Sequence, residues 1–243
     1  HELSVTLITV ANKNNKAGAE KYLKKLSKYF KQGAITTKIV VGNDAADIIL
    51  DEAQKDYDLL VLGATEGNQD RNHLFNPIVD YIVRVSPCPT LVIQAGEIDE
   101  KWGVNRILVP TNGSVAAKNA AELAFFIAKS DNNKEVLALH VVVPEERSIY
   151  QQDRRQIQKK TRFANEMVRE LKMLGEAFGV KTEKLVKEGK SPEQVITEIT
   201  ESNNIDLIVI GTSVRPGSER LYLGPRVENI LITAKCPVIV LNT

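Results

Sequence analysis

Glycines and small polar residues follow two apolar segments of the chain, where they could hold a ligand. Thr111-Asn112-Gly113-Ser114 comes directly after the segment 106–110, and Gly211-Thr212-Ser213 follows the segment 207–210. Such residues can line a pocket for ribose and phosphate, because they offer hydrogen bonds and close backbone approach. The same residue types form tight turns that cap a following helix, so both interpretations of 112–114 stay open.

The other residues that could do chemistry do not form an enzyme pattern. Cys88 and Cys236 each precede a proline, and no third metal ligand lies near either of them in the sequence. We therefore expect both cysteines to be small buried residues at the start of a strand rather than a redox pair or metal ligands. The sequence has no Gly-x-Ser-x-Gly motif, no complete phosphate loop ending in Gly-Lys-Ser/Thr and no metal-ligand cluster. We therefore expect neither catalysis nor a bound metal. His140 lies in an apolar run and should be packed or hydrogen-bonded, and His73 should lie at the surface.

Strands and helices alternate along the chain, and they would position these residues. Continuous apolar runs predict strands buried on both faces, and apolar residues at helical spacing predict the helices between them. In a parallel, doubly wound sheet, ligands bind beyond the carboxyl ends of the strands, here after Val109, Val143 and Ile210. The predicted strands are 3–10, 37–41, 59–62, 90–94, 106–110, 136–143, 184–186, 207–210 and 238–241; the predicted helices are 17–30, 44–55, 77–85, 116–128, 157–178, 226–233 and one that starts at 191–193.

The second half of the chain repeats the first at a constant offset of 148 residues (211 − 63). A repeat of this length indicates that a whole α/β domain was duplicated. The first copy begins at the second strand of the pattern and lacks a counterpart of 106–128. We expect a first domain at 1–97, a linker at 98–104 and a second domain at 105–243. Matching segments are 57–63 with 205–211, 76–79 with 224–227, and 88–89 with 236–237.

Composition excludes several classes of protein. The 243 residues are 43% hydrophobic and 26% charged, as in ordinary globular proteins. A net charge of +1 and an aromatic content of 5% argue against nucleic acid as a partner. No run of 18 apolar residues occurs. The abrupt start in a strand suggests a piece of a longer polypeptide, and the two lone cysteines favour the cytoplasm.

From residue 104 onward the sequence resembles the universal stress protein family. The first half resembles the same family over 3–94, from its second strand onward. The resemblance implies a Rossmann-like α/β fold with two doubly wound, mostly parallel sheets. It also implies an intramolecular pseudo-dimer in which 90–94 pairs with 238–241. The segments that carry the resemblance are 107–114, 139–142, Gly189 with Pro192, 206–211 and 236–240.

Many members of this family bind ATP, so the resemblance implies an adenine-nucleotide site in the second half. The positions of the family's phosphate loop fall on Gly211, Val214, Gly224 and Pro225 of this chain. The family has glycine where this chain has Val214, and serine or threonine where it has Pro225. Pro225 has no N–H to donate, although Ser213, Arg215 or Arg226 could replace that donor. The implied site residues are Pro110, Thr111, Asn112 near the ribose, Gly113, Val141 against adenine, Gly211, Ser213, Val214, Gly224, Pro225 and Arg226.

The corresponding loop of the first half has lost both later glycines. Its positions are Gly63, Glu66, Asn76 and Pro77. Because Glu66 would place a carboxylate at the phosphate position, we expect no nucleotide triphosphate to bind there.

The segment 211–227 resembles one branch of the family more closely, the tandem region behind the membrane domain of bacterial cation/proton antiporters. This implies a cytoplasmic regulatory or sensor module at the inner membrane. Its partner would be the membrane transport domain of the same polypeptide, and a homodimer would be possible. A structural or protein-interaction module with a degenerate site stays open as the alternative. We expect the charged insert 145–160 to be a solvated helix extension rather than a membrane-domain contact.

Overall fold

The computed structural model describes residues 4–30, 33–64, 74–94, 102–130, 134–144, 154–213 and 221–243, with side chains from residue 159 onward in the helix that begins at 154. Contacts divide the chain into two compact units. One holds His1–Asp58 with Val85–Cys88, and the other holds Leu59–Arg84 with Pro89–Thr243. The first sequence copy is therefore shared between the two units. The linker at 98–104 stays a prediction.

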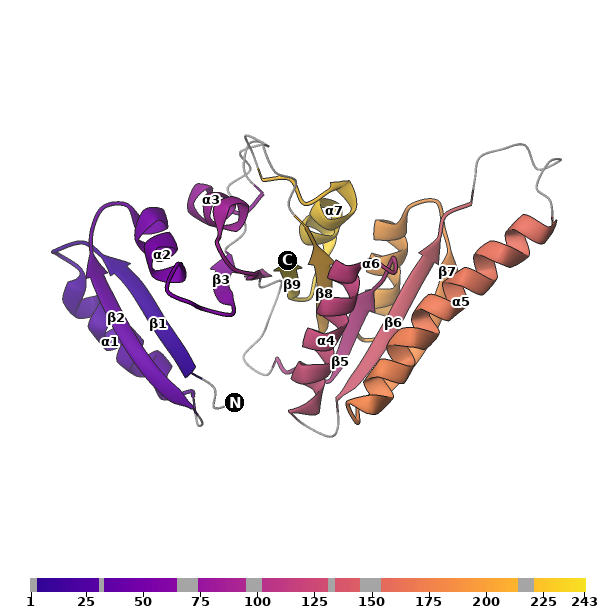
Figure 1. Cartoon of the computed structure of the whole chain (residues 1–243), viewed down its shortest axis with the longest axis horizontal. Coiled ribbons are helices and arrows are strands. Elements are labelled where there is room, and N and C mark those ends of the chain that lie inside the picture. Colours follow the sequence, from indigo (N-terminus) through magenta and orange to yellow (C-terminus); the bar gives the residue numbers. More distant parts are fainter. Residues whose placement is uncertain are drawn as a thin grey trace. The chain divides into compact units, whose positions relative to one another are not determined.

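The smaller unit contains β1 (Ser4–Ala11), α1 (Lys16–Ser27), β2 (Ala34–Val41) and α2 (Ala45–Ala53), and its two strands are parallel (Figure 1). Asp44 caps α2: its carboxylate accepts from the backbone N–H groups of Ala46 and Asp47, both at 3.1 Å. A charged acceptor at this position satisfies N–H groups that have no partner inside the helix. The predicted helix start is thus confirmed.

A polar cluster ties α2 to the strands of the smaller unit. The buried carboxylate of Glu52 pairs with the Nζ of Lys38 and accepts from the Nζ of Lys55 at 2.9 Å and the hydroxyl of Tyr57 at 2.7 Å. These donors, Lys38 foremost, lower the pKa of Glu52 to about 2. The Tyr57 hydroxyl also lies 3.0 Å from Thr6 Oγ1, which extends the cluster to β1.

The larger unit contains one mixed sheet with helices on both faces (Figure 1). Among the described residues its strands run in the order β3-β4-β9-β8-β5-β6-β7, and all pairs are parallel except β4–β9. That antiparallel pair places Thr90 opposite Asn242 and confirms the predicted pairing of the two final strands. The elements are β3 (Leu60–Ala64), α3 (Pro77–Val85), β4 (Thr90–Gln94), β5 (Arg106–Pro110), α4 (Val115–Lys129), β6 (Glu135–Val142), α5 (Arg154–Ala177), β7 (Lys181–Glu188), α6 (Pro192–Ser202), β8 (Leu207–Thr212), α7 (Pro225–Thr233) and β9 (Val238–Asn242).

The predicted α/β class with two parallel-rich sheets is confirmed, but the two sheets are unequal. In the second copy β5 pairs with β8 on one side and with β6 on the other, and so joins two pairs of strands. In chain order β1 and β2 correspond to β6 and β7, and β3 and β4 correspond to β8 and β9. No strand in the described part of the first copy takes the place of β5. Its four strands consequently lie in two different sheets.

Two hydrophobic cores lie on opposite faces of the larger sheet. Alternate residues of β5 point to different cores: Ile107 and Val109 join side chains of α4 and α5, whereas Leu108 joins those of α3, α6 and α7. Both faces of the central strands are therefore buried, as the continuous apolar runs predicted. None of the described helices combines the length and apolar character needed to cross a bilayer.

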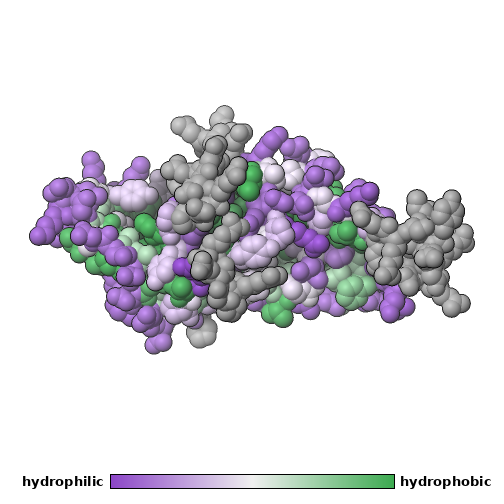
Figure 2. Space-filling view, turned by 90° about the horizontal axis from the view of Figure 1, so that it is seen from above, coloured by the Kyte–Doolittle hydropathy of each residue, from purple (hydrophilic) through white to green (hydrophobic). Residues whose placement is uncertain are grey.

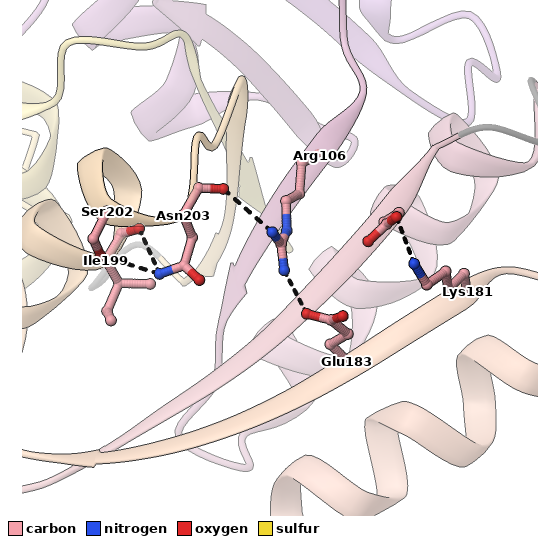
Figure 3. A network of polar contacts seen from close by, with 7 residues as sticks. Arg106, Lys181, Glu183, Ile199, Ser202 and Asn203 are labelled. Atoms are coloured by element: carbon pink, nitrogen blue, oxygen red, sulfur yellow. Dashed lines mark hydrogen bonds and ion pairs between the residues drawn. The ribbon is translucent and has the colours of Figure 1, made fainter.

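Polar contacts fix the amino end of β5 (Figure 3). The guanidinium of Arg106 pairs with Glu183 on β7 and donates to the carbonyl oxygen of Asn203 at 3.4 Å. The carboxylate of Asp206 accepts from the backbone N–H groups of Asn105 and Arg106, both at 2.9 Å. Since this end of the strand is held in place, the residues at its other end have defined positions.

Candidate functional site

A cleft of about 1120 Å³ lies at the carboxyl ends of β5 and β8. In the order β9-β8-β5-β6-β7 the chain leaves these two neighbouring strands in opposite directions, which makes this the switch point of the sheet. The walls come from the loops after both strands and from the first turns of α4 and α7. The lining residues are Asn112, Ser114, Val115, Ala116, Asn119, Gly211, Thr212, Ser213, Tyr222, Leu223, Gly224, Pro225, Arg226, Val227 and Thr243.

The loop after β5 is a turn that caps α4, and part of it also lines the cleft. Thr111 Oγ1 accepts from Gly113 N–H at 3.1 Å, Asn112 Oδ1 accepts from Ser114 N–H at 3.0 Å, and Ser114 Oγ accepts from Ala117 N–H at 3.2 Å. Gly113 has a φ of 79°, a conformation that favours glycine. Asn112 and Ser114 both face the cleft. The two interpretations of this loop are therefore compatible.

His140 holds the same loop from the neighbouring strand. Its Nδ1 lies 2.8 Å from the carbonyl oxygen of Thr111. The prediction that His140 is a hydrogen-bonded histidine is confirmed.

Gly211 is in close contact with a helix backbone. A Cβ added at this residue would lie 1.8 Å from the carbonyl oxygen of Ala116, at the start of α4. Glycine is therefore needed at this position so that α4 can approach β8 closely. The sequence pattern suggested an approach to phosphate, and the contact with α4 had no signal in the sequence.

The first turn of α7 leaves two backbone donors open to the cleft. Gly224, the residue before the helix, has a φ of 94° and no side chain to cap it. Pro225 has no N–H, and the Glu228 carboxylate accepts from Leu223 N–H at 3.2 Å. Among the described residues, none accepts a hydrogen bond from the N–H of Arg226 or Val227. These two groups point the positive end of α7 at the cleft.

The equivalent turn of the first copy has a side-chain cap that the second copy lacks. Asn76, equivalent to Gly224, accepts from Val79 N–H at 3.0 Å through its Oδ1. The Asp80 carboxylate, which is buried, accepts from the N–H groups of Leu74 and Phe75 at 2.8 and 2.9 Å. Glu228, the equivalent of Asp80, accepts from Leu223 N–H in the same way. The two copies therefore differ at one donor: Val79 N–H is capped by Asn76, whereas the equivalent N–H of Val227 is open.

The first turn of α4 adds further donors to the cleft of the second copy. The N–H groups of Val115 and Ala116 precede the capped Ala117 and have no acceptor among the described residues. The exposed Arg226 adds a positive charge. Arg226 also lies near Glu193, whose pKa is lowered mainly by the Ser191 hydroxyl and to a smaller extent by this arginine. In its described part, the cleft thus combines two helix amino termini with the cationic side chain of Arg226.

The structure brings about half of the predicted site residues to this cleft. Pro110 and Thr111 at the end of β5, Gly113 in its turn and Val141 on β6 do not line it. Val214, Arg215, Glu66 and His73 lie outside the described residues. Sequence reasoning missed Asn119, Tyr222 and Thr243, which only the tertiary fold brings together, whereas Val115 and Ala116 could have been inferred from the cap of α4. The predicted residues that do line the cleft are Asn112, Gly211, Ser213, Gly224, Pro225 and Arg226.

No other candidate site emerges from the described residues. In that part of the chain no group of three or more His, Cys, Asp or Glu side chains could hold a metal ion. Cys88 and Cys236 form no disulfide in the described part of the chain, and both are half-buried rather than fully buried. Burial raises the pKa of the Cys236 thiol to about 11.

The second copy is a doubly wound α/β domain with a ligand-sized cleft at its switch point. The chain belongs to the universal stress protein family, which matches residues 4–94 and 103–242. Universal stress protein MJ0531 of Methanocaldococcus jannaschii is 34% identical over 144 residues, which cover 56% of this chain and 81% of that protein. The universal stress protein E homolog of Haemophilus influenzae is 24% identical over 213 residues, which cover 83% of this chain and 68% of that protein. A universal stress protein structure from Archaeoglobus fulgidus has the same fold, with a TM-score of 0.67 at 18% identity over 98% of this chain and 86% of that one.

Proposed function

We propose that this protein is a non-catalytic regulatory module that binds an adenine nucleotide in the cleft of its second copy. The phosphates would accept hydrogen bonds from the open N–H groups at the first turns of α4 and α7. Arg226 would add charge to that interaction. Binding would favour one conformation of a partner through its higher affinity for that state.

One observation carries this proposal. At equivalent positions the first copy has Asn76, whose Oδ1 accepts from Val79 N–H, and the second copy has Gly224, which leaves the equivalent N–H of Val227 open beside that of Arg226. Helix amino termini with open N–H groups bind phosphate well, because both the donors and the helix dipole favour an anion. The family resemblance supplies the adenine nucleotide as the ligand class.

Isothermal titration calorimetry with ATP, ADP, AMP and cyclic dinucleotides tests the proposal. We expect heat of binding for at least one adenine nucleotide at up to millimolar concentration, and weaker binding in Arg226→Ala. Arg162→Ala is the matched control, because Arg162 lies on α5 and pairs with Glu166. Pro225→Ser restores both an N–H and a hydroxyl, and should strengthen binding. Absence of heat with every nucleotide, in Pro225→Ser as well, would refute nucleotide binding.

A second candidate is a structural or protein-interaction module with a degenerate site. Pro225 favours it, because the first residue of α7 cannot donate to phosphate. Gly211 favours it as well, since the Ala116 carbonyl fills the space beside this glycine. This candidate predicts that Pro225→Ser gains no affinity for any nucleotide.

We propose further that the module regulates a cation/proton antiporter from the cytoplasmic face of the inner membrane, as part of a longer polypeptide. The resemblance of the segment 211–227 to that branch of the family supports this assignment. The complete reading frame provides the test: it should contain the membrane helices of a transporter. A reading frame without them would refute the antiporter assignment but leave nucleotide binding intact.

A further inference from the structure

One face of the β3–β4 pair exposes apolar side chains that are buried in the second copy. Leu59, Val61 and Ile93 expose 38%, 55% and 37% of their surface. Isolated exposed apolar residues are ordinary, and those visible in Figure 2 form small separate patches. The contrast with the second copy is what distinguishes this face. The equivalent residues, 148 positions later, expose far less: 3% for Leu207, 0% for Val209 and 8% for Leu241.

Helix α4 is what covers this face in the second copy. Its start approaches β8 so closely that a Cβ at Gly211 would lie 1.8 Å from the Ala116 carbonyl oxygen. The first copy also has glycine at this position, Gly63, where an added Cβ would meet nothing within 4 Å. Glycine inside a strand weakens the sheet, and it often marks a place where another backbone approaches closely. No such backbone lies beside Gly63 among the described residues. Gly63 thus fits a helix that the described residues do not include.

Asp58 gives a second, independent sign of a missing element. Its equivalent, Asp206, accepts from the backbone N–H groups of Asn105 and Arg106, where β5 begins. Asp58 is exposed, and no described residue forms a hydrogen bond or ion pair with it. The acceptor that holds the start of a strand in the second copy is therefore present and unused in the first.

One edge of β3 also lacks a neighbouring strand among the described residues. Among the described residues β3 pairs with β4 alone, whereas its equivalent β8 pairs with both β9 and β5. A strand placed as β5 is in the second copy would satisfy the free edge of β3.

We propose that the open face and free edge of β3 bind a β-strand followed by an alanine-rich helix, supplied by residues that precede Ser4 in the full-length polypeptide. Chain order favours this source: α4 leads through a short connection into β6, and β1 is the equivalent of β6. The helix would present small side chains, as α4 does. The buried positions of α4 are Ala117, Ala120, Ala121, Ala124, Phe125 and Ala128. This proposal is independent of nucleotide binding.

Cysteine labelling tests the proposal directly. Val61→Cys is made with Cys88 and Cys236 replaced by serine, both in the 243-residue chain and in a chain extended along its natural reading frame. The extension must be at least as long as Arg106–Lys134. A maleimide should label Val61→Cys readily in the shorter chain and at least about tenfold more slowly in the extended one, because burial blocks access to the thiol. Ile232→Cys, at a position that is 74% exposed on α7, should label equally in both chains.

A second substitution tests the close approach of the helix. Gly63→Ala should leave the urea midpoint of the shorter chain nearly unchanged and lower that of the extended chain. Equal labelling of Val61→Cys in both chains would overturn the proposal. So would a reading frame without a strand and helix before Ser4. Slow labelling in the shorter chain together with a dimeric mass would show that a second copy covers the face, and would also overturn it.

Discussion

Gly63 and Gly211 occupy the same repeat position, and we predict opposite tolerance to alanine. In Gly211→Ala the new Cβ would lie 1.8 Å from one backbone atom, Ala116 O, and 2.2 Å from the carbonyl carbon of that residue. Restoring an ordinary contact requires α4 to move from β8 by roughly 1.5 Å, which places the cost at about 3 kcal/mol, the upper end for overpacking. For a chain of this size, that corresponds to a melting temperature lower by roughly 6–12 °C.

Gly63→Ala is the matched control. No atom lies within 4 Å of the added Cβ, and φ is not positive, so nothing opposes the methyl group. We expect the free energy of unfolding to change by no more than about 1 kcal/mol. The change should be an increase, because alanine restricts the unfolded chain more than glycine does. Urea denaturation followed by the fluorescence of Trp102, the single tryptophan, measures both variants in the larger unit. Equal costs for the two alanines, or a cost below about 1 kcal/mol for Gly211→Ala, would refute the packing role of Gly211.

Three further predictions concern polar groups. Lys38 and its neighbours lower the pKa of Glu52, so this carboxylate stabilises the fold above its unfolded pKa near 4.5. The contribution disappears as the pH falls through about 2. The urea midpoints of Glu52→Gln and the native chain should therefore differ at pH 7 and converge near pH 2. Asp206→Ala removes the acceptor for two backbone N–H groups and should cost about 1–3 kcal/mol, whereas Asp58→Ala should be neutral in chemical denaturation of this chain. The raised pKa of Cys236 predicts slower alkylation at pH 8 than that of a free cysteine, and mass spectrometry of the labelled peptide would reveal equal rates if the reasoning were wrong.

Local sequence signals were sufficient for most elements of the fold. Helix 77–85 and strand 90–94 have the predicted bounds, because proline marks the helix start and a proline precedes the strand. The strand predicted at 184–186 spans Lys181–Glu188, since pairing with β6 extends a charged segment at the edge of the sheet. Tertiary pairing of this kind has no local signal.

The candidate site was less predictable than the fold. Asn112 and Ser114, which the sequence singled out for their turn chemistry, lie in one wall of the cleft, and their role in binding stays a prediction. The role of Gly211 was not visible, because its close contact is with a helix that begins at residue 115. Tyr222 and Thr243 line the cleft through the fold alone, since their local sequence has no binding pattern.

The central claim is that the second copy holds an open anion site, whereas Asn76 of the first copy caps the donor equivalent to Val227 N–H. Titration of the ¹⁵N-labelled chain with ATP, followed by amide chemical shifts, tests this most directly. We predict the largest shifts at the N–H groups of Val115, Ala116, Arg226 and Val227, with the amides of Leu74, Phe75 and Val79 unchanged. Shifts centred on the first-copy amides would contradict the claim. So would the absence of any shift at the four second-copy amides at millimolar ATP.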